Sequence, residues 1–279
     1  MSGRAAEVAW IDAHVERTGD VEEVRSRPWA TVLRVPTAAG PVWMKLPGPQ
    51  TRFEVPLYGL LARRVPERVL MPIAADVERG WLLLPDGGPH AELDELPAAL
   101  GAYGRLQREL AGDVAEMLAL GVPDMRPEIM PERFQEALAA VGGNPEVEAM
   151  APQVDEWCAR LAASPVPAGL DHNDLHHENV LGGGRFYDWG DSVVAHAFAV
   201  ALVPLGMLLG HRGEEAYARA CDAYLEAFAD LGPRDALAET LVVACRVAKI
   251  ARTLTWVRAA PGESAAAQQL ATLLEESHV

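Results

Sequence analysis

The stretch from residue 170 to 192, LDHNDLHHENVLGGGRFYDWGDS, concentrates polar side chains that can do chemistry. It contains the pattern His172-x-Asp174-x-x-x-x-Asn179, followed by Asp-Trp-Gly at 188–190. The composition of this chain gives about 0.005 chance occurrences of His-x-Asp-x-x-x-x-Asn, so the pattern indicates a site rather than coincidence.

Phosphoryl transfer is the chemistry that this set of side chains suits. The reaction needs a carboxylate that orients the attacking hydroxyl and accepts its proton, and Asp174 fits that role. It also needs hard oxygen ligands for Mg²⁺, which the amide of Asn179 and the carboxylate of Asp188 can supply. A glycine turn at 182–184 lies between these two residues, so a tight hairpin would bring both to one ion. The donor set favours Mg²⁺ over zinc, which prefers His and Cys.

The first 85 residues predict a small sheet with one crossing helix. The runs WATVLRV at 29–35 and VWMKL at 42–46 flank a Pro/Gly turn, which is typical of a β-hairpin. Thr51 as N-cap and Glu54 three residues later form a capping-box pattern, which predicts that a helix begins there. Further elements are expected as a helix at 5–17 and strands at 69–74 and 80–84.

After the Pro/Gly break at 85–89 the pattern becomes helical, with apolar residues spaced by three and four. Helices are expected at 96–119, 131–140, 146–163, 195–210, 213–231, 234–258 and 264–276. The predicted fold class is therefore α+β, with a small antiparallel β-sheet lobe at 1–85 and a larger, mainly helical lobe at 86–279 joined by a hinge at about 84–88.

The composition excludes several classes of protein. The chain is 50% hydrophobic and 23% charged, as in globular proteins, and no apolar run reaches the roughly 18 residues that cross a bilayer. The start carries acidic residues among apolar ones, unlike a secretory signal, so a cytoplasmic location and no membrane partner are expected. Three scattered cysteines form neither a disulfide framework nor a zinc-ligand pattern.

The net charge of −16 makes a nucleic-acid partner improbable on electrostatic grounds. The acidity is concentrated after residue 85, since residues 1–85 are near neutral. An acidic region of this kind would attract a polycationic small molecule. An ordinary acidic surface explains the same charge and is the alternative.

The motif resembles the catalytic and metal-binding loops of the aminoglycoside phosphotransferase and choline kinase families, which share a protein-kinase-like fold. The order of the lobes matches as well. By position, the resemblance implies that Asp174 is the catalytic base, that Asn179 and Asp188 bind Mg²⁺, and that His172 supports the catalytic loop.

The same resemblance implies a nucleotide site in the first lobe. It requires a lysine on the third strand paired with a helical glutamate, and Lys45 and Glu54 stand at those places. Lys45 is one of only two lysines in the chain. For Glu54 the capping box is a second explanation that does not exclude an ion pair. The segment Leu84, Pro85 and Asp86 resembles the hinge that meets the adenine edge of ATP, although GTP stays possible.

One feature departs from the family pattern. No G-x-G-x-x-G lies in the first hairpin, whose turn is PTAAG. The nucleotide phosphates must then be covered less closely, or by the segment SRPWAT at 26–31.

Other residues carry weaker patterns. Asp191 could bind a cationic substrate, but capping of a helix near 195 is the favoured interpretation. His176 and His177 lie beside Asp174 and could touch substrate, but packing in the loop is the favoured interpretation. Arg246, Lys249 and Arg252 fall on one helix face, which could meet an anionic group, but a solvated face is the favoured interpretation.

The sequence thus predicts an enzyme, a small-molecule O-phosphotransferase that uses a nucleoside triphosphate and Mg²⁺. The expected acceptor is a hydroxyl of an amino sugar, an aminoglycoside-like compound or another cationic metabolite. A choline or amino-alcohol kinase and a catalytically silent nucleotide-binding protein are the alternatives. A protein kinase is disfavoured because no arginine precedes Asp174 in the motif and no Ala-Pro-Glu follows it. The pattern leaves the oligomeric state open.

Overall fold

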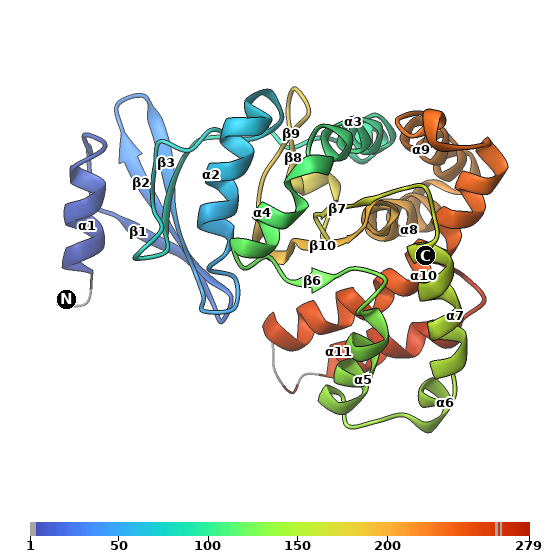
Figure 1. The fold of residues 1–279 in the computed structure, drawn as a ribbon. Helices are drawn as coiled ribbons and strands as arrows, with labels where there is room; N and C mark the ends of the chain where they lie inside the picture. Colours follow the sequence, from blue (N-terminus) through green and yellow to red (C-terminus); the bar gives the residue numbers. More distant parts are fainter. Residues whose placement is uncertain (1–3, 260–261, 263) are drawn as a thin grey trace.

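The computed structural model describes residues 4–259, 262 and 264–279. A small sheet and a larger helical part lie side by side, with helix α2 (Glu54–Arg64) between them (Figure 1). The predicted α+β class, with an antiparallel sheet first and a mainly helical remainder, is confirmed.

The sheet has five antiparallel strands in the order β1-β2-β3-β5-β4. Their bounds are Glu22–Arg27 for β1, Ala30–Thr37 for β2, Gly40–Pro47 for β3, Ala74–Asp76 for β4 and Trp81–Pro85 for β5. The predicted hairpin is β2–β3, and its turn closes at Gly40, whose φ of 113° favours glycine.

The two faces of the sheet have different surroundings. Leu33, Val35 and Met44 alternate onto one face and are buried against helix α1 (Ala5–Asp12), where they form a small separate core. The opposite face of the same strands carries Val32 and Lys45 and borders the cavities described below. One face of the sheet is therefore packed in a core, and the other borders a cavity.

The helical part is built on one large apolar core. Its helices are α3 (Leu96–Glu109), α4 (Val114–Ala119), α5 (Met130–Ala140), α6 (Pro145–Glu148), α7 (Ala151–Ala162), α8 (Leu202–Arg212), α9 (Glu214–Glu226), α10 (Arg234–Ala259) and α11 (Ser264–Ala271). Two short sheets complete it. One joins β6 (Asp124–Met125), β10 (Val193–His196) and β7 (Ala168–Asp171), and the other is the hairpin of β8 (Val180–Leu181) and β9 (Arg185–Phe186).

Several boundaries differ from the sequence prediction. The first helix ends at Asp12, the strand expected at 69–74 lies at 74–76, and the helix expected at 96–119 is interrupted by a 3₁₀ turn at 111–113. Residues 193–196 form a strand, so the helix expected from 195 begins at Leu202. The helix expected at 146–163 is divided into α6 and α7.

The predicted capping box at Thr51 is wrong. Helix α2 has Phe53 as its N-cap residue, without a side-chain cap. The Thr51 hydroxyl instead donates to the carbonyl oxygen of Trp29 at 2.6 Å. That frees the Glu54 carboxylate for another partner.

In the described part of the chain, no helix combines the length and the apolar character that crossing a bilayer requires. The three cysteines are free thiols, as expected from their scatter.

Candidate functional site

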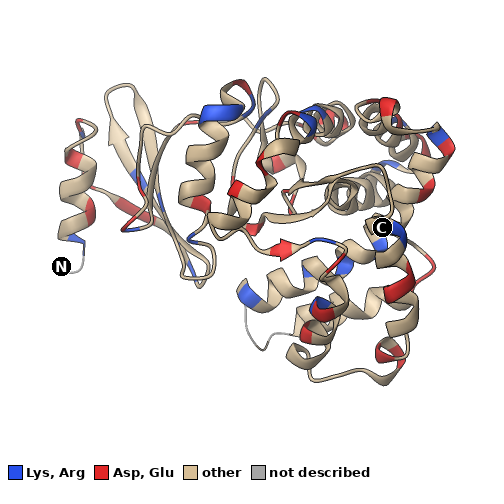
Figure 2. Ribbon diagram, in the orientation of Figure 1, with Lys and Arg blue, Asp and Glu red and all other residues tan. Residues whose placement is uncertain are grey.

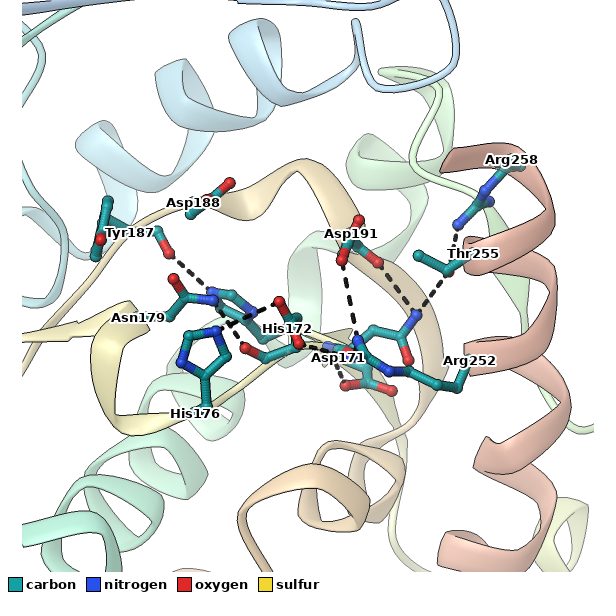
Figure 3. Close-up of polar contacts among 12 residues, drawn as sticks. Asp171, His172, His176, Asn179, Tyr187, Asp188, Asp191, Arg252, Thr255 and Arg258 are labelled. Carbon is teal, nitrogen blue, oxygen red and sulfur yellow. Dashed lines mark hydrogen bonds and ion pairs between the residues drawn. The ribbon is translucent and has the colours of Figure 1, made fainter. Parts of the chain in front are cut away.

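Figure 3 shows polar side chains from the loop after β7, from the segment after β9 and from α10 gathered at one place. Two residues of this group, Asn173 and Asp188, have left-handed backbones with φ of 59° and 61°. Non-glycine residues adopt this conformation at a cost, and such residues cluster at functional sites. Both carry short polar side chains, which tolerate the conformation best.

Asp174 lines a cavity of about 590 Å³, and its side chain is 26% exposed. Its Oδ1 accepts a hydrogen bond from Nη2 of Arg252 at 2.7 Å, and its Oδ2 lies 3.5 Å from Nε2 of His176. Burial opposes ionisation, but His176 and the guanidinium of Arg252 outweigh it and hold the pKa of Asp174 below its usual 3.8. The carboxylate is therefore ionised at neutral pH and open to a ligand on one side.

Asn179 and Asp188 line the same cavity. The amide nitrogen of Asn179 donates to the carbonyl oxygen of Asp174 at 2.9 Å, which turns the amide oxygen away from that contact. The glycine turn that separates them, at 182–184, does close the predicted β8–β9 hairpin.

Lys45 connects the sheet with the helical part. Its Nζ donates to Oε1 of Glu54 at 2.7 Å and to Oδ1 of Asp188 at 2.5 Å. Burial disfavours the ammonium, but the charges of Asp188 and Glu54 outweigh it and raise the pKa of Lys45. Burial opposes ionisation of Asp188 as well, while the charge of Lys45 lowers its pKa below the usual 3.8. The predicted pairing of Lys45 with Glu54 is thus present, and it includes Asp188.

Glu54 is the most buried member of this network, with 0% of its surface exposed. Desolvation raises its pKa to about 7 despite the opposing charge of Lys45. Gly190 lies against it, since a Cβ at that position would come within 3.2 Å of Oε2 of Glu54. Glycine at this position avoids that tight contact.

His172 is fully buried beneath the loop. Its Nε2 lies 2.9 Å from the carbonyl oxygen of Tyr187, and its ring centroid is 4.9 Å from that of Trp189. Desolvation lowers its pKa, so the imidazole is neutral. The ring links the start of the motif to the segment that carries Asp188.

A second cavity, of about 430 Å³, lies where the sheet meets the segment after β5. Leu84, Pro85 and Asp86 line it, as do Lys45 and Asp188. The last two residues also line the first cavity, so the cavities meet at this pair. Oδ1 of Asp86 accepts the N–H of Gly88 at 3.0 Å, which fixes the turn at the edge of the cavity.

The helix-capping interpretation of Asp191 needs correction. Asp191 caps no helix, because strand β10 follows it; its side chain instead lines the 590 Å³ cavity. Burial and the charge of Asp174 raise the pKa of Asp191 to about 6. His177 does not line this cavity, whereas its neighbour His176 does.

Arg252 is the residue that the sequence interpretation missed. It is not on a solvated face: its side chain is 13% exposed, pairs with Asp174 and donates to the carbonyl oxygen of Asn173. Its guanidinium lies 5.4 Å from the ring centroid of Trp256. The spacing of Arg246, Lys249 and Arg252 on one helix face was the available pattern, and it could not reveal that Arg252 meets the loop that carries Asp174.

The donor chemistry fits Mg²⁺. Asn179 and Asp188 offer an amide oxygen and a carboxylate, which are ligands that Mg²⁺ accepts together with phosphate oxygens and water. No group of three or more His, Cys, Asp or Glu residues that could hold a metal occurs in residues 4–259 and 264–279.

The model of the family described as "Phosphotransferase enzyme family" matches residues 29–239. The match includes Lys45, Asp174, Asn179 and Asp188, and it covers most of the chain. The chain belongs to this phosphotransferase family. A comparison with curated protein sequences finds no significant match.

Solved structures show the same fold. A choline/ethanolamine kinase family protein from Mesorhizobium loti aligns with a TM-score of 0.65 at 16% identity, covering 98% of this chain and 95% of that one. A spectinomycin phosphotransferase in complex with ADP and spectinomycin aligns with a TM-score of 0.53 at 12% identity over 99% and 95% of the two chains. An ethanolamine kinase from Plasmodium vivax aligns with a TM-score of 0.64 at 12% identity over 93% and 82%. The fold of this phosphotransferase is therefore protein-kinase-like.

Proposed function

We propose that this phosphotransferase moves the γ-phosphate of a nucleoside triphosphate to a hydroxyl of a small molecule, with Asp174 as the catalytic base. The observation that carries the proposal is the ionised, part-exposed carboxylate of Asp174 in one cavity with Asn179 and Asp188. A carboxylate in this place can orient an incoming hydroxyl and accept its proton.

The nucleotide is proposed to occupy the 430 Å³ cavity, with its base against Leu84, Pro85 and Asp86 and its phosphates toward Lys45. Pro85 lacks an N–H and offers only a carbonyl, so the amides must come from the residues beyond it. ATP is the expected nucleotide, in keeping with the ADP complex of the spectinomycin phosphotransferase; GTP stays an alternative.

Asn179 and Asp188 would hold Mg²⁺, which when bound neutralises charge on the phosphates and orients them. Lys45 keeps Asp188 ionised and in place, and Glu54 in turn orients Lys45. His172 supports the loop by its contact with Tyr187. Since each carboxylate and cation has a stated partner, the arrangement is pre-organised for charge stabilisation.

The acceptor is proposed to enter the 590 Å³ cavity on the side of Asp191, Arg252 and Trp256. An amino sugar or another cationic metabolite suits Asp191, whose carboxylate faces this space. Figure 2 shows that acidic residues are spread over the helices, so the net charge alone marks no acceptor face. Choline and ethanolamine, the acceptors named for similar structures, belong in the same test.

The direct test is a screen of amino sugars, aminoglycosides, choline and ethanolamine for Mg²⁺-dependent consumption of ATP or GTP. Phosphorylation of one acceptor at its hydroxyl is the expected result. A protein that binds Mg·ATP tightly and transfers phosphate to none of the compounds would support the silent nucleotide-binding alternative.

Replacing Asp188 with Asn should weaken Mg·ADP binding by about tenfold or more, because a charged ligand of the ion is lost while the shape stays. Titration calorimetry with and without Mg²⁺ measures this effect. Metal-free ADP should bind the variant and the parent equally. An unchanged Mg·ADP affinity would remove Asp188 from the metal site.

Replacing Arg252 with Gln should lower kcat by about tenfold, since Asp174 loses a charged hydrogen bond that orients it. Arg246 lies on the same helix but binds carbonyl oxygens of the C-terminal segment at Glu275 and Glu276, so Arg246→Gln is the matched control. Steady-state kinetics compare the two variants, and equal rates would show that Arg252 acts only in folding.

A further inference from the structure

The β1–β2 hairpin borders both cavities but lacks the glycine-rich turn that would cover phosphates with backbone amides. Its turn is instead anchored to the segment before α2. The carbonyl oxygen of Trp29 accepts the N–H of Gly48 at 2.7 Å and the hydroxyl of Thr51 at 2.6 Å. A side chain at Gly48 would clash with the carbonyl of Pro28, so glycine is needed for this approach. The hairpin is therefore held in a fixed place over the cavities.

A β-bulge in β1 changes which side chains face the cavity. Glu23 pairs with Leu33 and Arg25 pairs with Val32, which leaves Val24 as an extra residue. In a regular strand successive side chains point to opposite faces, and a bulge breaks that alternation. Both Val24 and Arg25 line the 430 Å³ cavity as a result. The bulge thus lets a cation of β1 join the cavity lining.

Arg25 stands in a row with Lys45. Arg25 pairs across the strands with Val32, and Val32 pairs with Lys45. Residues paired in this way share a face of the sheet, and two strand spacings place the backbones of Arg25 and Lys45 roughly 10 Å apart. Both residues line both cavities, so both face the space where the cavities meet.

Charge at this junction calls for a second cation. Lys45 is already paired with the carboxylates of Glu54 and Asp188, so its charge is shared with both before any ligand binds. Within the described residues Arg25 has no ion pair, whereas Arg34 in the same hairpin lies 3.9 Å from Glu22. A polyphosphate entering the junction would meet one cation committed to two carboxylates and one that is available. A guanidinium binds phosphate oxygens through paired N–H donors.

We propose that Arg25 binds the polyphosphate of the nucleotide and supplies the contact that a glycine-rich turn would otherwise provide. The inference rests on the proposed nucleotide site and adds to it a residue and a ligand group. It also explains how the hairpin serves a nucleotide although its turn is fixed and carries no glycine.

The test compares the affinities of ADP and adenosine for Arg25→Gln, with Arg34→Gln as the control. Arg34→Gln removes the same charge from the same hairpin at a side chain that lines neither cavity. Arg25→Gln should weaken Mg·ADP binding by about tenfold and leave adenosine binding unchanged, because adenosine has no phosphate. The control variant, Arg34→Gln, should change the affinities for Mg·ADP and for adenosine by no more than about twofold. GDP and guanosine are titrated in parallel.

Three other outcomes overturn a claim. If the parent protein binds neither ADP nor GDP, the proposed function fails and the role of Arg25 fails with it. If the parent binds ADP and the two variants lose equal affinity, the effect is one of net charge and only the role of Arg25 is rejected. An equal loss for ADP and adenosine in Arg25→Gln would show a disturbed cavity, which also rejects a phosphate contact.

Discussion

Replacing Asp174 with Asn or Ala is expected to lower kcat by about 10²–10⁴-fold, the usual contribution of a positioned general base. The binding of Mg·ADP should remain within about twofold of the parent, because Asp174 is proposed to contact the acceptor and not the base or sugar of the nucleotide. Stopped assays for the phosphorylated acceptor and calorimetry with Mg·ADP measure the two quantities separately.

The two replacements distinguish chemistry from packing. Asn keeps the volume of Asp and can still accept a hydrogen bond from Arg252, so a loss of turnover in this variant reflects the missing proton acceptor. Asp230→Asn is a matched control, since Asp230 pairs with Arg108 and is 60% exposed. Normal turnover of Asp174→Asn would mean that another group accepts the proton, and His176 at 3.5 Å would be the next candidate.

The elements that the sequence predicted well are those whose pattern is local. The β2–β3 hairpin follows from two β-branched runs around a Pro/Gly turn, and the β8–β9 hairpin from three consecutive glycines. Asp174, Asn179 and Asp188 line one cavity, as their spacing predicted, because a short hairpin keeps the residues before and after it close together. Residue type and spacing were sufficient there.

Strand β1 shows what a local pattern cannot predict. Its sequence, EEVRSR, has no alternation, and all six residues are exposed. The strand exists because its backbone pairs with the edge of β2, which is a contact between segments. Arg25 could therefore not be assigned to a cavity before the register and its bulge were known.

Arg252 was missed for a similar reason. A polar residue on a helix is usually solvated, and the sequence does not show which neighbour covers it. The helix that carries Arg252 lies against the loop that carries Asp174, and the two residues are 78 positions apart along the chain. Only the tertiary contact turns a surface-like position into one that contacts Asp174.

Thr51 and Glu54 fit the capping-box pattern in the sequence, but their side chains do not cap helix α2. The Thr51 hydroxyl donates to the carbonyl oxygen of Trp29, and the Glu54 carboxylate accepts from Lys45. Both partners lie in or beside strands of the sheet, outside the helix that the capping box would begin. A buried carboxylate gains more from a charged partner than from a backbone N–H. Tertiary pairing therefore overrode the local motif.

Replacing Lys45 with Met should destabilise the folded protein by about 3–5 kcal/mol, because it leaves Glu54 buried without its cation. Glu54 has no exposed surface and its Oε2 has no hydrogen-bond partner, so no other group takes over the role. Urea unfolding monitored by tryptophan fluorescence measures the loss. Turnover should fall as well, since Asp188 loses the same partner.

The double variant Lys45→Met/Glu54→Gln separates pair loss from the cost of a stranded charge. Removing both charges should restore part of the stability, since breaking one half of a buried pair costs more than replacing both halves. If the loss of stability in the double variant equals the sum of the losses in Lys45→Met and Glu54→Gln, the two side chains do not interact. Normal stability of Lys45→Met itself would contradict the buried pair.

The stability of the same variants should also change with pH in a direction that can be predicted. Burial already raises the pKa of Glu54 to about 7 beside Lys45, and loss of the ammonium removes the charge that opposes this shift. A carboxyl whose pKa is higher in the folded state binds more protons there than in the unfolded state, so stability falls as pH rises above the ordinary value of 4.5. The stability deficit of Lys45→Met should therefore be larger at pH 8 than at pH 6. A glutamine at position 54 cannot titrate, so the double variant should show the same stability deficit at pH 8 and at pH 6. If the deficit of Lys45→Met itself does not depend on pH, the unpaired charge is not that of Glu54.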